Sequence, residues 1–400
     1  MKKSVNLIFQ VHQSYALRRY RFFDIGNDHY YYDDYANETT TVWLARHSYL
    51  PATSMLLRKV LQLKGALKVS FYISGVALEM FQKYAPSVID SFKRLAETGH
   101  VEFLCGTWSH SIASIKCRDT FKEQIGMHKS FVGKLFGQVP ITFFNAELLY
   151  SDDIGSMLFD FGYKAAIVEG AKPVLGWRSP DMLFSNAIRP EFKLLMRNRK
   201  ICDKITGSFG EQHQQNFRIP PSELLEEIEK TIPGEQVVNL SFNLALPISV
   251  LSVETGIFTL METLLTGIAK SEHLQFSTPS ESAKTYPPSV VLSVPHPVSW
   301  ADEKHDIASL TGNELQQEAL NQLFGLSSRI YKCENAEILN DWNKLQATDH
   351  FYYMSANYYN KQLQNRPNPY QTAHEAFVNY MNIVSDFKMR LDKICPADVT

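Results

Sequence analysis

The sequence lacks an uninterrupted apolar run of the roughly 18 residues that a membrane-spanning helix requires. It also lacks an excess of charge of one sign, because 40 Lys and Arg residues are balanced by 42 Asp and Glu residues, which gives a formal net charge of −2. Surfaces that bind nucleic acids or anionic lipids carry a clear basic excess. We therefore expect neither a membrane nor a nucleic acid as a partner.

Cysteine is scarce and irregularly spaced. The five cysteines are Cys105, Cys117, Cys202, Cys333 and Cys395. Their odd number and the lack of CxxC spacing favour reduced thiols over a disulfide framework or a zinc site. The N-terminal apolar run is interrupted by Asn6, Gln10 and His12 and has no small-residue cleavage site, so it predicts a strand and not a signal peptide. A cytoplasmic location is the expectation from both observations.

Metal-ligand motifs are missing as well. The chain has no HxxxH spacing and no Asp-Asp pair with a histidine at a strand end, and eight residues separate His296 from His305. Sites for zinc or another transition metal usually need such closely spaced ligands, and this sequence does not provide them. We expect no metal and no other cofactor.

What the chain does contain is a large apolar fraction and many short β-rich runs. A hydrophobic content of 44% over 400 residues is enough for one barrel-sized domain with an appendage, or for two domains. The β-rich runs are Val5–Val11, Val69–Ile73, Val101–Cys105, Ile141–Asn145, Ala165–Val168, Val237–Phe242 and Val290–Val294. Helical patterns separate them, which predicts parallel strands joined by crossover helices. Seven such strands indicate a barrel-like sheet that is incomplete.

The character of the sequence changes after about Trp300. Gly and Pro thin out, and apolar residues recur at helical spacing, as at Leu315, Ala319, Leu323, Leu326 and Ile330. We expect helices to the end of the chain, with a loop at Asn365–Gln371 and a further helix over Ala373–Leu391. These helices are expected to pack as a cap on the barrel, in preference to forming an independent binding module.

Polar and aromatic residues follow directly on several of the predicted strands. His12 and Gln13 follow the first, Trp108 and His110 follow the third, and Glu147 follows the fourth. In a parallel barrel the carboxyl ends of all strands meet at one rim, where the loops build the site. We therefore expect these side chains to converge.

Glu147 lies in the segment Phe143–Tyr150, which reads FFNAELLY. A lone glutamate beyond a strand is more often solvated than catalytic. Glycosidic bonds are usually cleaved between two carboxyl groups, one acting as nucleophile or base and one as acid. The surrounding sequence decides between these interpretations.

At FFNAELLY the chain resembles glycoside hydrolase family 57, whose α-amylase members carry a phenylalanine, arginine, asparagine, threonine and glutamate run at the nucleophile. The resemblance covers nearly the whole chain, in the family's order. The other segments that carry it are Val11–Gly26, Val69–Glu79, Glu97–Ser111, Ile167–Pro180, Phe192–Asn198, Val298–Asp306 and Thr348–Ser355.

The resemblance implies an α/β fold, namely an incomplete (β/α)7 barrel over residues 1–300 followed by a C-terminal helical bundle over residues 301–400. It also implies retaining chemistry on α-glucans or maltooligosaccharides without a metal. Glu147 matches the nucleophile, His12 and Gln13 match residues that line a glucose subsite, and His110 matches a histidine of the loop after the third strand.

Aromatic residues near the matched segments suit sugar stacking, although core packing is an equally good interpretation of each. The resulting set of substrate-binding candidates is His12, Gln13, Trp108, His110, Trp177, Trp300 and Asp349.

The segment of the catalytic acid departs from the family. There the family reads Asn-Leu-Phe-Met followed by Asp-Tyr-Glu-Thr-Phe-Gly-Glu, with Thr-Gly-Ile-Phe a fixed distance later. Here Asn239 matches the start and Thr255–Phe258 match the end without a gap. That register places Asn243 at the position of the catalytic aspartate, and Leu244–Ser249 replace the rest of the motif. Because an amide has no proton to donate, the first chemical step loses its general acid.

Two further positions have lost charge. Phe144 stands where the family has an arginine beside the nucleophile. Ile201–Phe209 corresponds to a family stretch with paired aspartates and an arginine, of which only Asp203 remains.

Three functions stay open. The first is a catalytically impaired α-amylase-like protein, a pseudoenzyme, that binds α-glucan or regulates a partner. The second is an active retaining hydrolase or transglycosylase that uses Glu147 with a relocated general acid. The third is a structural protein whose cleft is filled. The carboxylates available for a relocated acid are Glu79, Glu102, Glu169, Glu254, Asp302 and Asp349.

Overall fold

The computed structural model describes residues 2–207, 219–230, 232–244, 257–301, 304–355 and 368–396. Its strands are β1 (Lys3–Val11), β2 (Val69–Ile73), β3 (Val101–Phe103), β4 (Thr142–Phe144), β5 (Ala165–Glu169), β6 (Leu183–Asn186), β7 (Lys193–Arg197), β8 (Val237–Asn243), β9 (Leu274–Ser277) and β10 (Val290–Leu292).

The helices between the strands are α1 (Asp34–Leu44), α2 (Leu50–Gln62), α3 (Gly75–Tyr84), α4 (Pro86–Glu97), α5 (Arg118–Phe136), α6 (Asp152–Asp160), α7 (Lys172–Leu175), α8 (Arg199–Gly207), α9 (Pro221–Glu229), α10 (Ile257–Lys270) and α11 (Pro279–Thr285). Those after the last strand are α12 (Ala308–Thr311), α13 (Glu314–Phe324), α14 (Ser327–Cys333), α15 (Ala336–Leu345), α16 (Thr348–Tyr352) and α18 (Ala373–Ile394).

Within the described residues, parallel strands close into a ring in the order β1, β2, β3, β4, β5, β7, β8. The contact between β3 and β4 is a single bridge, in which the Phe144 amide donates to the Cys105 carbonyl at 2.7 Å and the Cys105 amide donates to the Thr142 carbonyl at 3.0 Å. The strand β9 pairs with Lys3–Asn6, the first half of β1, while β2 pairs with the second half. The predicted (β/α)7 barrel is confirmed.

One strand was placed wrongly from the sequence. Val290–Leu292 lies outside the ring, where β10 pairs with β6 and β6 runs antiparallel to β7. The strand that completes the ring is Lys193–Arg197, which the β-rich runs did not reveal. Its apolar part is only three residues long, between charged ends, so it carries little pattern of its own.

Large side chains fill the interior of the ring. Ile8, Tyr72, Phe144, Ile167 and Leu195 come from five different strands and form one buried cluster. The Phe144 ring stacks on Tyr72 with 5.1 Å between centroids. Layers of bulky side chains are what closes the inside of such barrels. The interior below the rim is therefore a packed core and not a channel.

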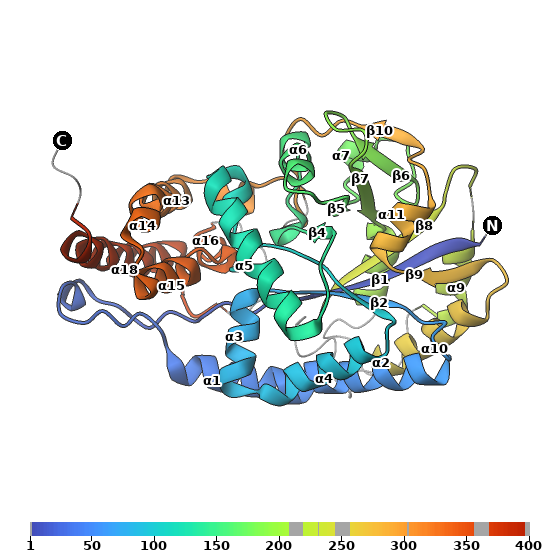
Figure 1. Cartoon of the computed structure of the whole chain (residues 1–400), viewed down its shortest axis with the longest axis horizontal. Helices are drawn as coiled ribbons and strands as arrows, with labels where there is room; N and C mark the ends of the chain where they lie inside the picture. The colour runs from blue at the N-terminus through green and yellow to red at the C-terminus, as the bar shows by residue number, and fades with distance from the viewer. Residues whose placement is uncertain are drawn as a thin grey trace.

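The helices α13, α14, α15 and α18 gather at one end of the molecule, drawn in orange and red in Figure 1. The connection between β1 and α1 runs beside α18. There Asn379 accepts a hydrogen bond from the Tyr20 amide at 2.7 Å, and the Tyr31 hydroxyl donates to Asp386 at 2.8 Å. The helical C-terminal region is thus confirmed, and a boundary at residue 300 between two domains stays a prediction.

The C-terminal region holds a further departure from expectation. Cys333 at the end of α14 and Cys395 just after α18 form a disulfide, with Cα atoms 5.6 Å apart. The prediction of reduced thiols was wrong for this pair, because the two lie 62 positions apart in the sequence and only the packing of the helices brings them together. Cys105, Cys117 and Cys202 are free thiols.

Further sequence predictions concern the last helix, the loop before it and the absence of membrane spans. The helix expected over Ala373–Leu391 is α18, and the loop expected at Asn365–Gln371 falls partly outside the described residues. In the part of the chain that the structure describes, no helix combines the length and apolarity needed to cross a membrane.

Candidate active site

Glu147 stands at the rim, in the tight turn Ala146–Leu148 that follows β4. Its backbone is left-handed, with φ 53°, a conformation that non-glycine residues adopt at a cost. Asn145 holds the turn, because its side chain accepts from the Ala146 amide at 3.0 Å and donates to the Leu149 carbonyl at 2.8 Å. The strained turn fixes the direction of the Glu147 side chain.

The carboxylate of Glu147 is fully buried and has a donor on each oxygen. His110 Nε2 lies 3.1 Å from Oε1, and the indole Nε1 of Trp300 donates to Oε2 at 2.9 Å. The Trp300 amide and the Ser299 hydroxyl also donate to the backbone carbonyl of Glu147, at 3.0 and 2.9 Å. The segment after β10 is thereby attached to the turn after β4.

His110 is neutral at pH 7. Burial, with the neighbouring His12 as a smaller cause, lowers the pKa of His110 from 6.5 to about 4, although Glu147 acts in the opposite direction. A neutral imidazole that faces a carboxylate through Nε2 carries its proton there. The other nitrogen, Nδ1, then faces the hydroxyl of Tyr72 at 3.2 Å.

His12 extends this cluster to the C-terminal helices. Its ring stacks on that of His110 with 4.1 Å between centroids. Its Nδ1 lies 2.8 Å from the Ser74 hydroxyl, and its Nε2 lies 2.8 Å from Oδ2 of Asp349 on α16. Of the side chains that follow the strands, His12 and His110 therefore converge with Glu147 as expected, and the binding candidates Trp300 and Asp349 join them.

A second polar cluster lies at the ends of β5 and β7. Arg197 contacts both oxygens of Glu169 at 3.4 Å, and its other terminal nitrogen lies 3.0 Å from Asp203. The guanidinium also lies over the Trp300 ring, 5.4 Å from its centroid. Burial raises the pKa of the Glu169 carboxyl, and Arg197 opposes that shift. Arg197 lies in the segment Phe192–Asn198, which resembles the family, but no sequence pattern assigned it to the site, because it ends a strand too short to be recognised.

Asn243 is the last residue of β8 and pairs in register with Gln10 of β1. Side chains alternate along a strand. Leu240 and Phe242 lie in the outer core, and the side chain of Asn239 meets Asn6 inside the ring. Asn243 therefore faces the barrel mouth. Within the described residues, Gln10 Oε1 is buried there without a hydrogen-bond partner.

Three predicted binding residues do not join the cluster. Trp108 is buried against Phe131, with 5.1 Å between centroids, which is the core-packing role that the sequence left open. Gln13 donates to Thr41 Oγ1 of α1 at 2.8 Å. Trp177 is 89% exposed, just beyond α7. The position of an aromatic residue near a matched motif does not reveal whether its ring faces the site, the core or the solvent.

Some positions of interest lie outside the described residues. They are Glu254, Asp302 and all but Leu244 of the segment that replaces the acid motif. Within the described ranges, no group of three or more His, Cys, Asp or Glu side chains is arranged to hold a metal ion.

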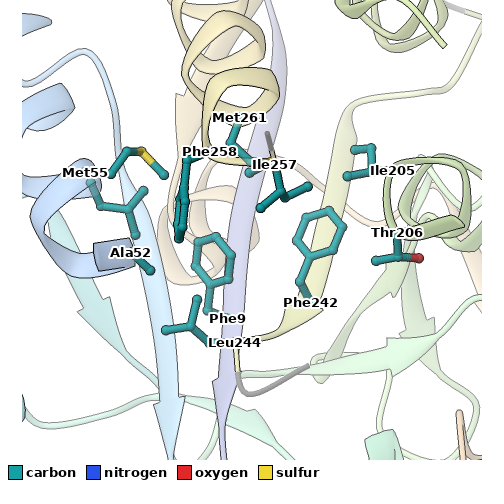
Figure 2. A pocket seen from close by; sticks show the side chains of 11 residues that line it. Phe9, Ala52, Met55, Ile205, Thr206, Phe242, Leu244, Ile257, Phe258 and Met261 are labelled. Carbon is teal, nitrogen blue, oxygen red and sulfur yellow. The ribbon is translucent and has the colours of Figure 1, made fainter. Parts of the chain in front are cut away.

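An apolar cavity of about 30 Å³ lies away from this cluster (Figure 2). Phe9 of β1 and Phe242 of β8 point into it from the outer face of the ring, opposite Met55 of α2 and Met261 of α10. Such a volume holds about one water molecule, and an apolar lining gives water no partner. The cavity is a gap in helix-on-sheet packing and not a binding site.

Comparison with known proteins identifies the family. The model of glycosyl hydrolase family 57 matches residues 6–295 of the 400. The chain belongs to this family.

Individual proteins are similar over most of the chain. A Methanocaldococcus jannaschii protein named "Putative alpha-amylase" is 29% identical over 96% of this chain and 84% of its own length. The crystal structure of a family 57 branching enzyme from Thermococcus kodakaraensis matches with a TM-score of 0.66 at 12% identity, over 90% of this chain and 86% of that one.

A 4-alpha-glucanotransferase from Thermococcus litoralis matches with a TM-score of 0.65 at 14% identity, over 88% of this chain. The chain spans only 56% of the length of that enzyme. At these identities the two crystal structures support the family 57 fold alone.

We predict that protonation of His110 destabilises the fold in mild acid. Because its pKa is lower in the folded than in the unfolded protein, the folded state binds fewer protons, and stability present above pH 6.5 is lost as the pH falls toward 4. His110→Gln keeps a donor but cannot titrate. Between pH 7 and 5 it should lessen the loss of unfolding free energy by on the order of 1–2 kcal/mol in urea titrations.

The control substitution is His374→Gln, at an exposed position of α18. An identical pH dependence in the wild type and His110→Gln would contradict a buried neutral imidazole at this position.

Proposed function

We propose that this chain is a catalytically impaired α-amylase-like member of family 57 that binds α-glucan, either as a binding protein or as a regulator of a partner. The observation that carries the proposal is the asymmetry of the rim. Glu147 occupies the nucleophile position with its donors in place. Asn243 faces the barrel mouth where the resemblance calls for the acid.

The chemistry of an amide supports the impaired interpretation. Retaining glycosidases hold two carboxyl groups about 5–5.5 Å apart, and one must protonate the leaving oxygen. Loss of a general acid typically lowers the rate by 10² to 10⁴, about 3–5 kcal/mol of barrier. Asp349 does not offer an obvious replacement, because its Oδ2 is already held by His12.

The environment of Glu147 also supports the catalytically impaired interpretation. Both carboxylate oxygens are hydrogen bonded, and the side chain has no exposed surface. Donors that stabilise the ionised form of a carboxylate weaken it as a nucleophile. Any sugar that reaches Glu147 must first open the contacts that bury its carboxylate.

Glucan binding is supported by the polar groups at the mouth and by the similar proteins. Gln10 Oε1 is buried at the mouth without a partner in the described part of the chain. Buried polar atoms without partners are rare and need a reason, such as an absent ligand. The names of the relatives, an alpha-amylase and a 4-alpha-glucanotransferase, indicate α-linked glucose as that ligand.

Titration calorimetry with maltoheptaose tests the glucan part. We expect measurable heat, and we expect Trp300→Ala to weaken binding at least tenfold, because it removes the aromatic ring beside Glu147. Val291→Ala, at an exposed position on the outer strand β10, is the matched control. If the folded protein shows no heat and no thermal stabilisation at millimolar sugar, α-glucan is ruled out as the ligand.

One observation favours a second candidate, an active enzyme with a relocated acid. Glu169 ends β5, the strand next to β4, and burial raises the pKa of its carboxyl as a general acid requires. Arg197 acts against this role, since an ion pair keeps a carboxyl ionised.

On that second candidate, Glu169→Gln should lower turnover of maltoheptaose at least 100-fold but spare an aryl α-maltoside, whose leaving group needs little protonation. Glu102→Gln is the control, because burial also raises the pKa of Glu102, which lies within β3 and not at the rim. Equal effects on both substrates would exclude Glu169 as the acid.

A further inference from the structure

A cleft of about 650 Å³ opens between the segment after β5 and the helix α8 after β7. Both elements follow strands whose carboxyl ends form the rim, so the cleft adjoins the Glu169–Arg197 cluster. Asp203 belongs to both, because it lines the cleft and pairs with Arg197 at 3.0 Å. A cavity of this size is typical of sites for small ligands.

The cleft is strongly basic in a chain that is slightly acidic overall. Five cationic side chains line it, and Asp203 is the acidic residue among the lining residues. The cations are Lys172, Arg178, Arg199, Lys200 and Lys204. A concave surface lined by one sign of charge concentrates ligands of the opposite sign.

The neighbouring carboxylates neutralise only part of this charge. Asp203 pairs with Arg199 at 3.0 Å and is shared with Arg197. Glu227 on α9 is shared between Lys200 at 2.8 Å and Lys204 at 2.5 Å. Among the described residues, Asp203, Glu227 and the Glu169 that pairs with Arg197 are fewer than the cations around them, which leaves a net positive charge there.

Two cations stand apart from these pairs. Lys172 at the start of α7 and Arg178 beyond its end have no ion pair within the described ranges of the chain. The guanidinium of Arg178 lies 5.7 Å from the centroid of the Trp177 ring. Arginine and lysine so placed are the usual ligands of phosphate groups.

The exposed side chain of Trp177 indicates what the uncharged part of the ligand is. It does not line the cleft itself but lies at its edge, between the lining residues Gly176 and Arg178, and it is 89% exposed. An indole is costly to leave in water, and one beside a polar cleft is suited to stack on the apolar face of a sugar. Phosphate alone would occupy only a small part of 650 Å³.

We propose that this cleft binds a phosphate monoester on a sugar, with Lys172 and Arg178 holding the phosphate and Trp177 stacking on the sugar ring. The ester could belong to a free hexose phosphate or to a phosphorylated α-glucan chain that continues along the rim toward Trp300. Only the second source rests on the function proposed above.

Calorimetry on the full chain tests the proposal, with inorganic phosphate, glucose, glucose 6-phosphate and glucose 1-phosphate as probes. At least one sugar phosphate should bind tenfold or more tightly than either phosphate or glucose. Its affinity should fall several-fold when the salt concentration is raised from 50 to 300 mM, because screening weakens charge pairing.

Variants separate the two roles. Lys172→Gln with Arg178→Gln should weaken sugar phosphate binding at least tenfold. Trp177→Ala should weaken sugar phosphate binding several-fold and leave phosphate binding unchanged. Lys122→Gln with Lys134→Gln, which removes the same number of charges at exposed positions of α5, is the matched control and should have no effect. If the double variant shows no thermal unfolding transition and is therefore not folded, Lys172→Gln alone, at an exposed position, serves in its place.

The affinity for maltoheptaose that carries one 6-phosphate distinguishes a free sugar phosphate from a phosphorylated α-glucan. Binding tenfold tighter than glucose 6-phosphate assigns a phosphorylated glucan, and equal binding assigns a free sugar phosphate. Maltoheptaose that binds while no sugar phosphate does would overturn this proposal and leave the glucan function intact. Sugar phosphate binding that ignores Lys172, Arg178 and Trp177 would also overturn it.

Discussion

The buried carboxylate of Glu147, held between the imidazole of His110 and the indole of Trp300, is the contact on which the rest of the rim depends. It joins the loops after β3 and β4 to the segment after β10. Through the stacked ring of His12 it reaches Asp349 and the C-terminal helices. A charge without exposed surface is tolerated only where donors surround it, so each of these elements must keep its place.

The two halves of the rim differ in what they can do. On the side of β1 to β4, an ordered network surrounds a carboxylate at the nucleophile position. On the side of β5 to β8, an ion pair between Glu169 and Arg197 and the amide of Asn243 take the places from which a proton donor could act. On our proposal the family 57 scaffold persists because binding needs the shape of the rim, whereas turnover needs a proton.

The sequence predicted those parts that local pattern encodes. Strand β2 was predicted at its observed bounds, and Glu147 was placed correctly beyond a buried strand. The pairing of Trp300 with Glu147 joins residues 153 apart, and that of His12 with Asp349 joins residues 337 apart. No periodicity records such contacts, and family resemblance supplied the residues without their partners.

The most direct test of the account is the chain-length distribution of maltoheptaose after long incubation with the wild-type protein and with Glu147→Gln, both at high concentration. The account predicts that turnover by the wild type is at least about 100-fold below the roughly 1–10³ s⁻¹ typical of enzymes, because no acid protonates the leaving oxygen. Turnover by the wild type within that typical range, lost in Glu147→Gln, would contradict it.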